Sequence, residues 1–176
     1  MTPLVSLFFF GGVSMFTEKE IEYYKNLSVY ERSKELVERL FKDRVDKSRK
    51  SYMNHLIKVS EDFEDEKIRS MALMHDVLED SNLQEKDLQN LGYDDEFIEV
   101  LKILTNTHDT YDEYIDAILQ SGNLIALQIK LKDLLHNMDI SRFENPQEED
   151  IERIKNKYLI AYVKILKKIE GEIKHD

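Results

Sequence analysis

Residues that form turns are scarce in this chain, and that scarcity limits the fold more than any other feature of the sequence. The 176 residues include five glycines and two prolines, whereas these two types together average about 12% of residues in proteins. From Thr17 onward the apolar residues recur at helical spacing, with no sustained alternation of apolar and polar positions. The pattern predicts an all-α protein with long helices and short connections.

Capping signals set the predicted helix boundaries. Ser28 with Glu31 forms a capping box, and Ser81 with Gln84 forms another. The segment 139–150 is the clearest loop. From these signals and the apolar spacing, the sequence predicts helices near residues 18–26, 29–44, 51–61, 65–79, 84–91, 94–105, 111–120, 123–138 and 148–170.

The length fits a single domain, since domains cluster near about 100 to 150 residues. Hydrophobic residues make up 41% of the chain, enough to bury a core, and no repeat or Pro/Gly-rich linker divides it. We therefore expect residues 15–176 to form one domain. Its last helix should pack on the domain body through a stripe at steps of three and four residues: Ile151, Ile154, Tyr158, Ala161, Ile165 and Ile169.

The N-terminal stretch 3–16 is the one strongly apolar run. It is shorter than the roughly 20 residues that a membrane span needs. It also has no Lys or Arg before Lys19, unlike a secretory signal. We expect the natural start at Met15, with residues 1–14 an upstream extension; the alternative is an apolar N-terminal tail that touches a membrane. Without an export signal, we expect a cytoplasmic protein.

Composition excludes several kinds of site. Lys and Arg number 25 against 36 Asp and Glu, a net charge of −11, which argues against DNA or RNA as a partner because phosphates require a basic face. The absence of cysteine rules out disulfides, a thiolate nucleophile, a zinc ribbon and an iron–sulfur cluster. A metal would have to bind His and carboxylates. Self-association through Phe8, Phe9 and Phe10 is left open.

The segment 71–81, MALMHDVLEDS, places several acidic groups close together. On the predicted helix 65–79 and its end, His75 lies one turn from Glu79, and Asp76 one turn from Asp80. Three carboxylates this close repel one another unless a cation or raised pKa values relieve them. A bound divalent ion accounts for this arrangement, and an exposed acidic helix face is the alternative.

Two further segments hold polar residues in apolar surroundings. Lys130, Asp133 and Asn137 share one face of the predicted helix 123–138. A buried Asp needs a partner, which here would be a metal or Lys130. His55 is a lone imidazole among apolar residues, and by itself such a histidine is more often part of a core than a ligand.

The order of these segments resembles the HD-domain metal-dependent phosphohydrolases. The closest likeness is to the small (p)ppGpp hydrolase type, whose pattern runs Y-x-x-H, then A-L-x-H-D-x-x-E-D, then K-L-x-D-x-x-x-N. The matching stretches here are 52–55, 72–80 and 130–137, within a likeness that covers roughly residues 30–160. The resemblance implies a single-domain HD-domain helical bundle with one metal site between helices.

Position by position, the resemblance implies roles for these residues. His55, His75, Asp76 and Asp133 would ligate one divalent metal. Mn²⁺ is the expected ion, although Fe, Co or Zn would fit the same nitrogen and oxygen donors. The catalytic acidic pair, which orients the attacking water and moves protons, would be Glu79 and Asp80.

Substrate contacts are expected around this centre. Asn137 would hydrogen-bond the substrate, and Lys130 would support the site or face phosphate. Lys47, Arg142 and Lys157 are cations that could meet phosphates, with a surface charge as the alternative for each. Among the aromatic residues and the other histidines, Tyr111 and Tyr114 could line a base pocket or only pack, His108 matches no ligand position, and His136 is expected near the ligands or on the surface.

The implied activity is removal of 3'-pyrophosphate from (p)ppGpp-like guanosine nucleotides. The alternatives are an HD nucleotidase acting on 5'-phosphates and a non-catalytic HD module that binds a nucleotide. Departures from the family pattern concern the substrate and leave the metal ligands intact. They lie around the first His, in the late motif and after Leu104-Thr105, at Arg49, Ser51, Leu56, Lys132, Leu134 and Asn106.

Overall fold

The computed structural model describes residues 15–46 and 48–173, and its regular elements are all helical. The predicted all-α fold is therefore confirmed. The expectations for residues 1–14 and for Lys47 lie outside the described residues. Within the described ranges, no helix combines the length and the apolar character that crossing a membrane requires.

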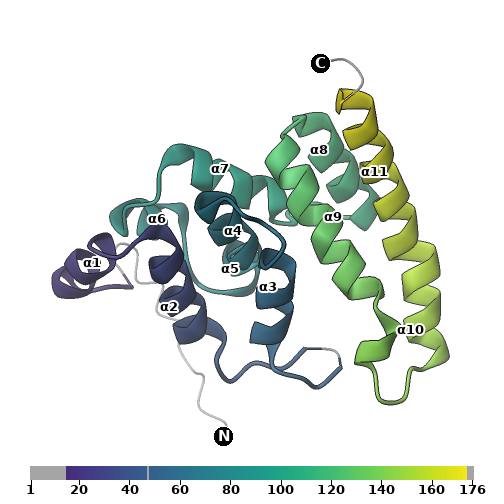
Figure 1. Ribbon diagram of the computed structural model, residues 1–176, viewed down its shortest axis with the longest axis horizontal. Coiled ribbons are helices and arrows are strands. Elements are labelled where there is room, and N and C mark those ends of the chain that lie inside the picture. Colours follow the sequence, from purple (N-terminus) through teal and green to yellow (C-terminus); the bar gives the residue numbers. More distant parts are fainter. Residues whose placement is uncertain (1–14, 47, 174–176) are drawn as a thin grey trace, which may run out of the picture.

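The helices fall into two groups along the chain (Figure 1). The first group occupies one side of the molecule and comprises α1 Glu18–Lys25, α2 Val29–Phe41, α3 Tyr52–Ser60, α4 Glu66–Leu73, α5 Val77–Asp80, α6 Glu85–Asn90 and α7 Asp95–Leu104. The second group comprises α8 Tyr111–Ser121, α9 Leu124–Met138, the 3₁₀ turn η1 Ile140–Arg142, α10 Glu148–Arg153, the π-helical turn η2 Ile154–Tyr158 and α11 Leu159–Ile173.

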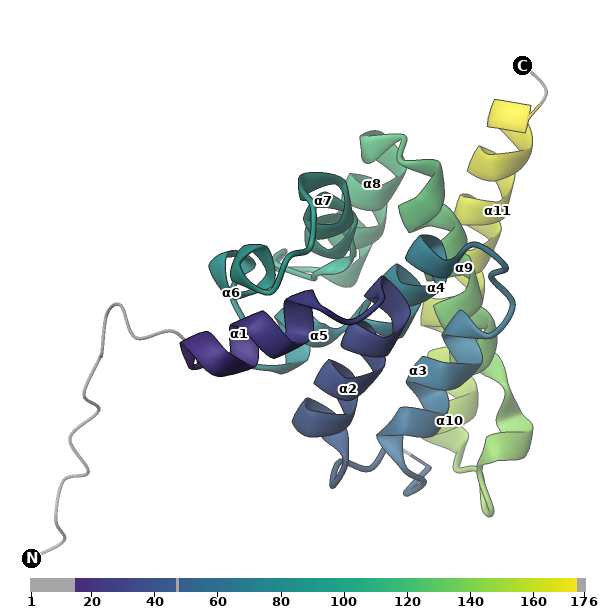
Figure 2. The same cartoon turned by 60° about the vertical axis from the view of Figure 1, so that its left-hand side comes forward.

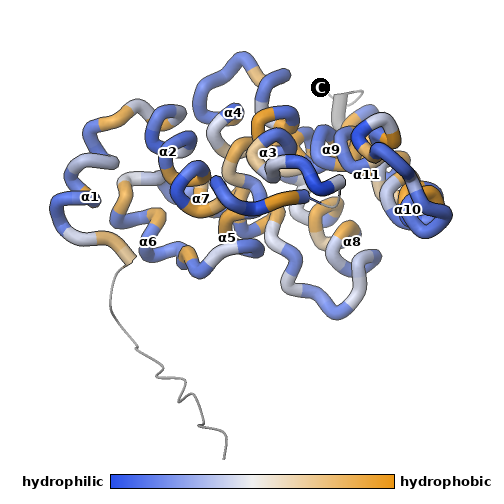
Figure 3. The backbone as a smooth tube through the Cα atoms, turned by 90° about the horizontal axis from the view of Figure 1, so that it is seen from below, coloured by the Kyte–Doolittle hydropathy of each residue, from blue (hydrophilic) through white to orange (hydrophobic). Residues whose placement is uncertain are grey.

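Helix α9 joins the two groups because it is apolar on two sides. Ala126 and Ile129 belong to the cluster formed with α2, α3, α4 and α7. Leu127 and Leu134 belong to a second cluster formed with α8 and α11. The helix accordingly packs against α3, α7 and α11, between α3 and α11 in Figure 2. Apolar segments gather toward the interior in Figure 3, where burial stabilises each large side chain by about 1.5–3 kcal/mol.

The predicted helix 65–79 is interrupted, which corrects its expected span. Asp76 still lies one turn before Asp80, whose backbone N–H donates to the Asp76 carbonyl at 2.8 Å. Helix α4 ends at Leu73 and α5 begins at Val77. The His75 ring donates from Nδ1 to the Ala72 carbonyl at 2.8 Å, a carbonyl that the backbone of a continuous helix would use. Such competition between side chain and backbone favours a break.

The C-terminal helix is also interrupted. A π-helical turn over 154–158 separates α10 from α11. The predicted stripe holds from the last residue of this turn onward, where Tyr158, Ala161, Ile165 and Ile169 are buried, whereas Ile151 before the turn is exposed. The wider turn changes the rotation of the helix, so a stripe at regular spacing cannot extend across it.

The two predicted capping boxes have different outcomes. Ser28 accepts the Glu31 backbone N–H at 3.3 Å, and Glu31 accepts the Ser28 N–H at 3.2 Å, as predicted. The pairing of Ser81 with Gln84 is wrong. Ser81 instead donates to the Val77 carbonyl at 2.6 Å and so ends α5, while Asp87 accepts the Gln84 backbone N–H at 3.1 Å.

An ion pair between segments distant in sequence fixes the loop that precedes α3. Asp46 accepts from the backbone N–H groups of Ser48 at 2.8 Å and Lys50 at 3.0 Å. Its second oxygen lies 2.6 Å from Arg142 Nη2 in η1, with both side chains largely buried. The pair therefore joins the loop before α3 to the turn after α9.

We expect Asp46→Asn to lower the free energy of unfolding by about 2 kcal/mol near neutral pH, because it leaves the Arg142 charge without its partner. Burial opposes ionisation of Asp46, but hydrogen bonds from Ser48 and Arg142 hold its pKa below the usual value. Its stabilisation is therefore present above the unfolded-state pKa of about 3.9 and is lost as the pH falls through the lower folded-state pKa.

Urea unfolding of both proteins between pH 3 and pH 7 measures this difference. Asp62→Asn is the matched control, since its ion pair with Lys132 is exposed and should contribute about 0–1 kcal/mol. A gap between wild type and Asp46→Asn that is no larger than that of the control, or that grows as the pH falls, would contradict the assigned role.

Candidate functional site

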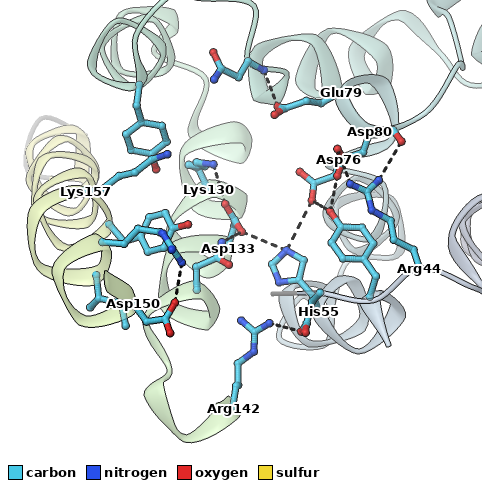
Figure 4. Close-up of a pocket in the computed structure, with 18 of the residues that line it drawn as sticks. Arg44, His55, Asp76, Glu79, Asp80, Lys130, Asp133, Arg142, Asp150 and Lys157 are labelled. Carbon is cyan, nitrogen blue, oxygen red and sulfur yellow. Dashed lines mark hydrogen bonds and ion pairs between the residues drawn. The ribbon is translucent and has the colours of Figure 1, made fainter. Parts of the chain in front are cut away.

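The four residues expected as metal ligands meet at one point (Figure 4). His55 comes from α3, His75 and Asp76 from the turn between α4 and α5, and Asp133 from α9. His55 Nε2 lies 3.3 Å from Asp133 Oδ1 and 3.8 Å from Asp76 Oδ2. His75 Nε2 lies 3.2 Å from Asp76 Oδ2 and 3.8 Å from Asp133 Oδ1. Three segments far apart in sequence thus bring two imidazoles and two carboxylates together.

The break between α4 and α5 allows neighbouring residues to face one point. On a continuous helix, His75 and Asp76 would diverge by about 100°. In the turn, where Asp76 has φ −101° and ψ 1°, both side chains reach the same centre. Among the described residues, His55, His75 and Asp76 offer potential ligand atoms that all lie within 4.8 Å of one another.

The nitrogen that His75 presents to this centre fits a metal. Because Nδ1 donates to Ala72, the neutral ring has its lone pair on Nε2. That nitrogen is buried without a hydrogen-bond partner, although a carboxylate oxygen lies beside it. Burial lowers the pKa of His75, but the charges of Asp76 and Asp133 outweigh burial and raise it to about 9. The centre thus favours a positive charge, which a proton or a metal ion can supply.

Asp133 is held in place by its own helix. Lys130 Nζ donates to Oδ2 at 2.8 Å, and Asn137 Nδ2 donates to Oδ1 at 2.5 Å. Burial opposes its ionisation, but the charge of Lys130 keeps the Asp133 pKa well below the usual value. Lys130 and Asn137, expected as substrate contacts, do line the pocket. Both also orient Asp133, which is the supporting role considered for Lys130 from the sequence.

Glu79 and Asp80 have different surroundings. Asp80 pairs with Arg44 Nη2 at 2.9 Å and accepts the Tyr52 hydroxyl at 3.0 Å. Glu79 has no ion pair within the described ranges, and it accepts the Asn106 backbone N–H at 2.9 Å. Partial burial raises the Glu79 pKa, the bond from Asn106 offsets part of this, and the charge of Asp76 adds to it. Of the two carboxylates, Glu79 is the one that no cation pairs with among the described residues.

The other described residues expected to contact substrate line the pocket, but some of them are held by other protein groups. Arg142 lines it but is held by Asp46 and by the His136 carbonyl, to which its Nη1 donates at 2.7 Å. Lys157 also lines the pocket, with Nζ 4.1 Å from the centre of the Tyr111 ring. The Tyr111 hydroxyl is buried without a hydrogen-bond partner.

Two expectations concerned residues at the edge of this region. Tyr114 lines the pocket as well, while its hydroxyl donates to the Leu104 carbonyl. His108 is exposed and is absent from the residues that line the pocket, in agreement with its lack of a ligand position.

Sequence reasoning missed several pocket residues. Arg44 donates to Asp80, and Arg153 pairs with Asp150 at 3.1 Å on the opposite wall. Neither arginine stands in a motif, so their positions depend on the tertiary structure. His136 does not line the pocket; it contacts His55, with the two Nδ1 atoms 2.7 Å apart, as expected for a residue near the ligands.

The site lies at the wall of a cavity of about 350 Å³ that extends from α3 and α5 to α8, α9 and η2. This is within the usual range for small-molecule pockets, about 300–1,000 Å³. The lining combines the acidic centre with aromatic and cationic side chains, as Figure 4 shows. The pocket therefore has an acidic end at this centre and an aromatic, cationic end beside Tyr111 and Lys157.

Neither a family model nor a curated protein matches this sequence. A solved structure does match. It is described as a metazoan ortholog of SpoT that hydrolyzes ppGpp and plays a role in starvation responses. The two share 20% sequence identity at a TM-score of 0.66, over 82% of this chain and 87% of the other. This chain therefore adopts the HD-domain fold that its ordered motifs predicted, the fold of that ppGpp-hydrolysing protein.

Proposed function

We propose that this protein is a metal-dependent phosphohydrolase that removes 3'-pyrophosphate from (p)ppGpp-like guanosine nucleotides. One observation supports this above all: two imidazoles and two carboxylates from three segments converge beside a pocket of nucleotide-compatible size. The shared fold with a ppGpp-hydrolysing protein supports the class of reaction. The ordered sequence motifs support the substrate.

His55, His75, Asp76 and Asp133 would hold the metal. Their nitrogen and oxygen donors suit Mn²⁺, and the unpartnered Nε2 of His75 is the donor that most needs a cation. When bound, a divalent ion supplies positive charge that activates water and offsets the charge on a phosphoryl oxygen. Tyr52 donates its hydroxyl to Asp76 and so fixes the orientation of that carboxylate.

Glu79 would hold and move the proton in hydrolysis. Its raised pKa brings the carboxyl closer to the range in which a group can both accept and donate a proton. Asp80 would instead position its surroundings, since Arg44 and Tyr52 both bind its carboxylate. The acidic pair named from the sequence thus divides into one proton carrier and one organiser.

The far wall of the pocket would meet the remainder of the nucleotide. Tyr111 offers an aromatic ring and an unpartnered hydroxyl, and Lys157 places a positive charge against that ring. Lys157 is a local cation of the kind that an acidic protein needs in order to bind an anionic substrate. Arg142 would act indirectly here, by holding the adjacent loop through Asp46.

Product analysis tests the substrate. Purified protein with Mn²⁺ is expected to release pyrophosphate from guanosine nucleotides that bear a 3'-pyrophosphate, and to leave 5'-monophosphates and 5'-triphosphates intact. Orthophosphate from the 5' compounds would instead identify a nucleotidase. Nucleotide-induced thermal stabilisation without any turnover would identify a binding module.

Asp76→Ala tests the metal site. We expect it to abolish measurable turnover and to weaken Mn²⁺ binding by at least about 100-fold, because it removes a charged ligand from the centre. Calorimetric titration measures binding, and far-UV circular dichroism checks that helicity is unchanged. Glu99→Ala, an exposed site on α7, is the control. Full activity of Asp76→Ala, or of metal-depleted wild type, would contradict the proposal.

Glu79→Gln separates proton transfer from metal binding. We expect kcat to fall by about 10²- to 10⁴-fold, the usual contribution of a general acid–base residue, with Mn²⁺ affinity near that of the wild type. The neutral amide keeps the size of the side chain and its capacity to accept from Asn106. Steady-state kinetics and metal titration of the same preparation check both parts, and a kcat equal to that of Glu99→Gln would refute the role.

A further inference from the structure

His136 contacts His55 through the ring nitrogen of His55 that faces away from the metal site. The two Nδ1 atoms lie 2.7 Å apart, and the rings stack with centroids 4.9 Å apart. The opposite nitrogen of His55, Nε2, faces Asp133 at 3.3 Å. A hydrogen bond between two ring nitrogens needs one donor and one acceptor, so the pair has two alternative proton arrangements.

Binding of a metal ion to His55 would select one of these two proton arrangements. If His55 Nε2 binds a cation through its lone pair, the neutral ring has its proton on Nδ1. That proton can then be donated only to His136 Nδ1, which must be unprotonated. In the reverse arrangement, His136 donates to His55, and the proton on His55 Nε2 points toward Asp133. That proton occupies the position a metal would take.

The other histidine of the centre has no such ambiguity. His75 Nδ1 faces the carbonyl of Ala72 at 2.8 Å. Since a carbonyl can only accept, the backbone fixes the His75 tautomer and no substitution of a neighbouring side chain can change it. The tautomer of His55 depends instead on the side chain of His136, so a substitution at His136 can test it.

The helix and the turn that follows it hold the His136 ring against His55. The ring is half-buried, on the same face of α9 as Asp133 three residues earlier. Arg142 Nη1 donates to the His136 carbonyl at 2.7 Å, and Asp46 fixes the same guanidinium at 2.6 Å. These contacts hold the turn after α9 beside His136.

We propose that His136 is a positioning residue that accepts the Nδ1 proton of His55 and thereby keeps His55 Nε2 available as a metal ligand. The inference rests on the proposed function, because it takes the His55–Asp133 centre to be a divalent-cation site. It assigns His136 no contact with substrate. Partners of this kind set ring orientation and ligand basicity in metal sites.

Two substitutions separate hydrogen bonding from packing. His136→Phe keeps an aromatic ring against His55 but removes the acceptor, and we expect Mn²⁺ affinity to fall by about 10- to 100-fold. In His136→Asn, the amide oxygen can take the place of Nδ1 as acceptor, and affinity should stay close to that of the wild type. Mn²⁺ binding is measured by electron paramagnetic resonance of the free ion, and circular dichroism confirms folding.

A measurement on the wild type keeps the inference testable if a variant fails to fold. In protein loaded with diamagnetic Zn²⁺, ¹⁵N NMR of the imidazoles should show a proton on His55 Nδ1 and none on His136 Nδ1. A proton on His136 Nδ1 in the loaded protein would overturn the inference. So would equal Mn²⁺ affinities of wild type and folded His136→Phe.

These outcomes are distinct from a failure of the proposed function. A wild-type protein that binds neither Mn²⁺ nor Zn²⁺ would overturn the metal site and the inference with it. A wild type that binds Mn²⁺ and hydrolyses nucleotide, with His136→Phe unaffected in metal binding, would overturn the inference alone.

Discussion

The hydrogen bond from the His75 ring to the Ala72 carbonyl determines the geometry of the site. It uses a carbonyl that a continuous helix would need, and the helix breaks between Leu73 and Val77. The same bond fixes which ring nitrogen keeps a lone pair. One interaction thus both bends the backbone and leaves Nε2 of the neutral ring with a free lone pair. Without the break, adjacent residues could not direct a nitrogen and a carboxylate to one point.

Helix α9 contributes side chains to both apolar clusters and also carries polar residues of the site. Its leucine, isoleucine and alanine side chains are buried on two sides, against α3 and α7 and against α8 and α11. Its polar residues Lys130, Asp133, His136 and Asn137 all take part in the contacts around the centre. The centre is therefore assembled only where both helix groups pack on α9, and its geometry depends on the entire fold.

Local sequence features predicted much of this architecture. Helical spacing and few turn formers indicated an all-α fold, and the ordered motifs brought His55, His75, Asp76 and Asp133 into one group, which the structure places together. Glu79 and Asp80 follow from the same motif. Their different surroundings do not, because the difference arises from Arg44, which lies 36 residues before Asp80 in the chain.

The features that the sequence did not predict also arise from contacts between residues that are distant in the chain or from local departures from regular helix. The helix break needs a buried ring competing for a carbonyl, and the Asp46–Arg142 pair joins residues 96 positions apart. Ile151 fits the stripe of the last helix by spacing, yet it is exposed because the π-helical turn shifts the register. Periodicity describes a regular helix, so any departure that tertiary contacts impose lies beyond it.

The π-helical turn at 154–158 is equivalent to a helix that has gained one residue without breaking. The surplus is absorbed at the pocket wall, where Ile154, Lys157 and Tyr158 line the cavity. Closing this turn into a regular α-helix with every residue kept would rotate everything before it by about 100° relative to α11. Ile151 would then join the buried stripe, and Arg153 would turn away from the pocket. The composition of this wall is therefore set by a length difference of a single residue as much as by residue type.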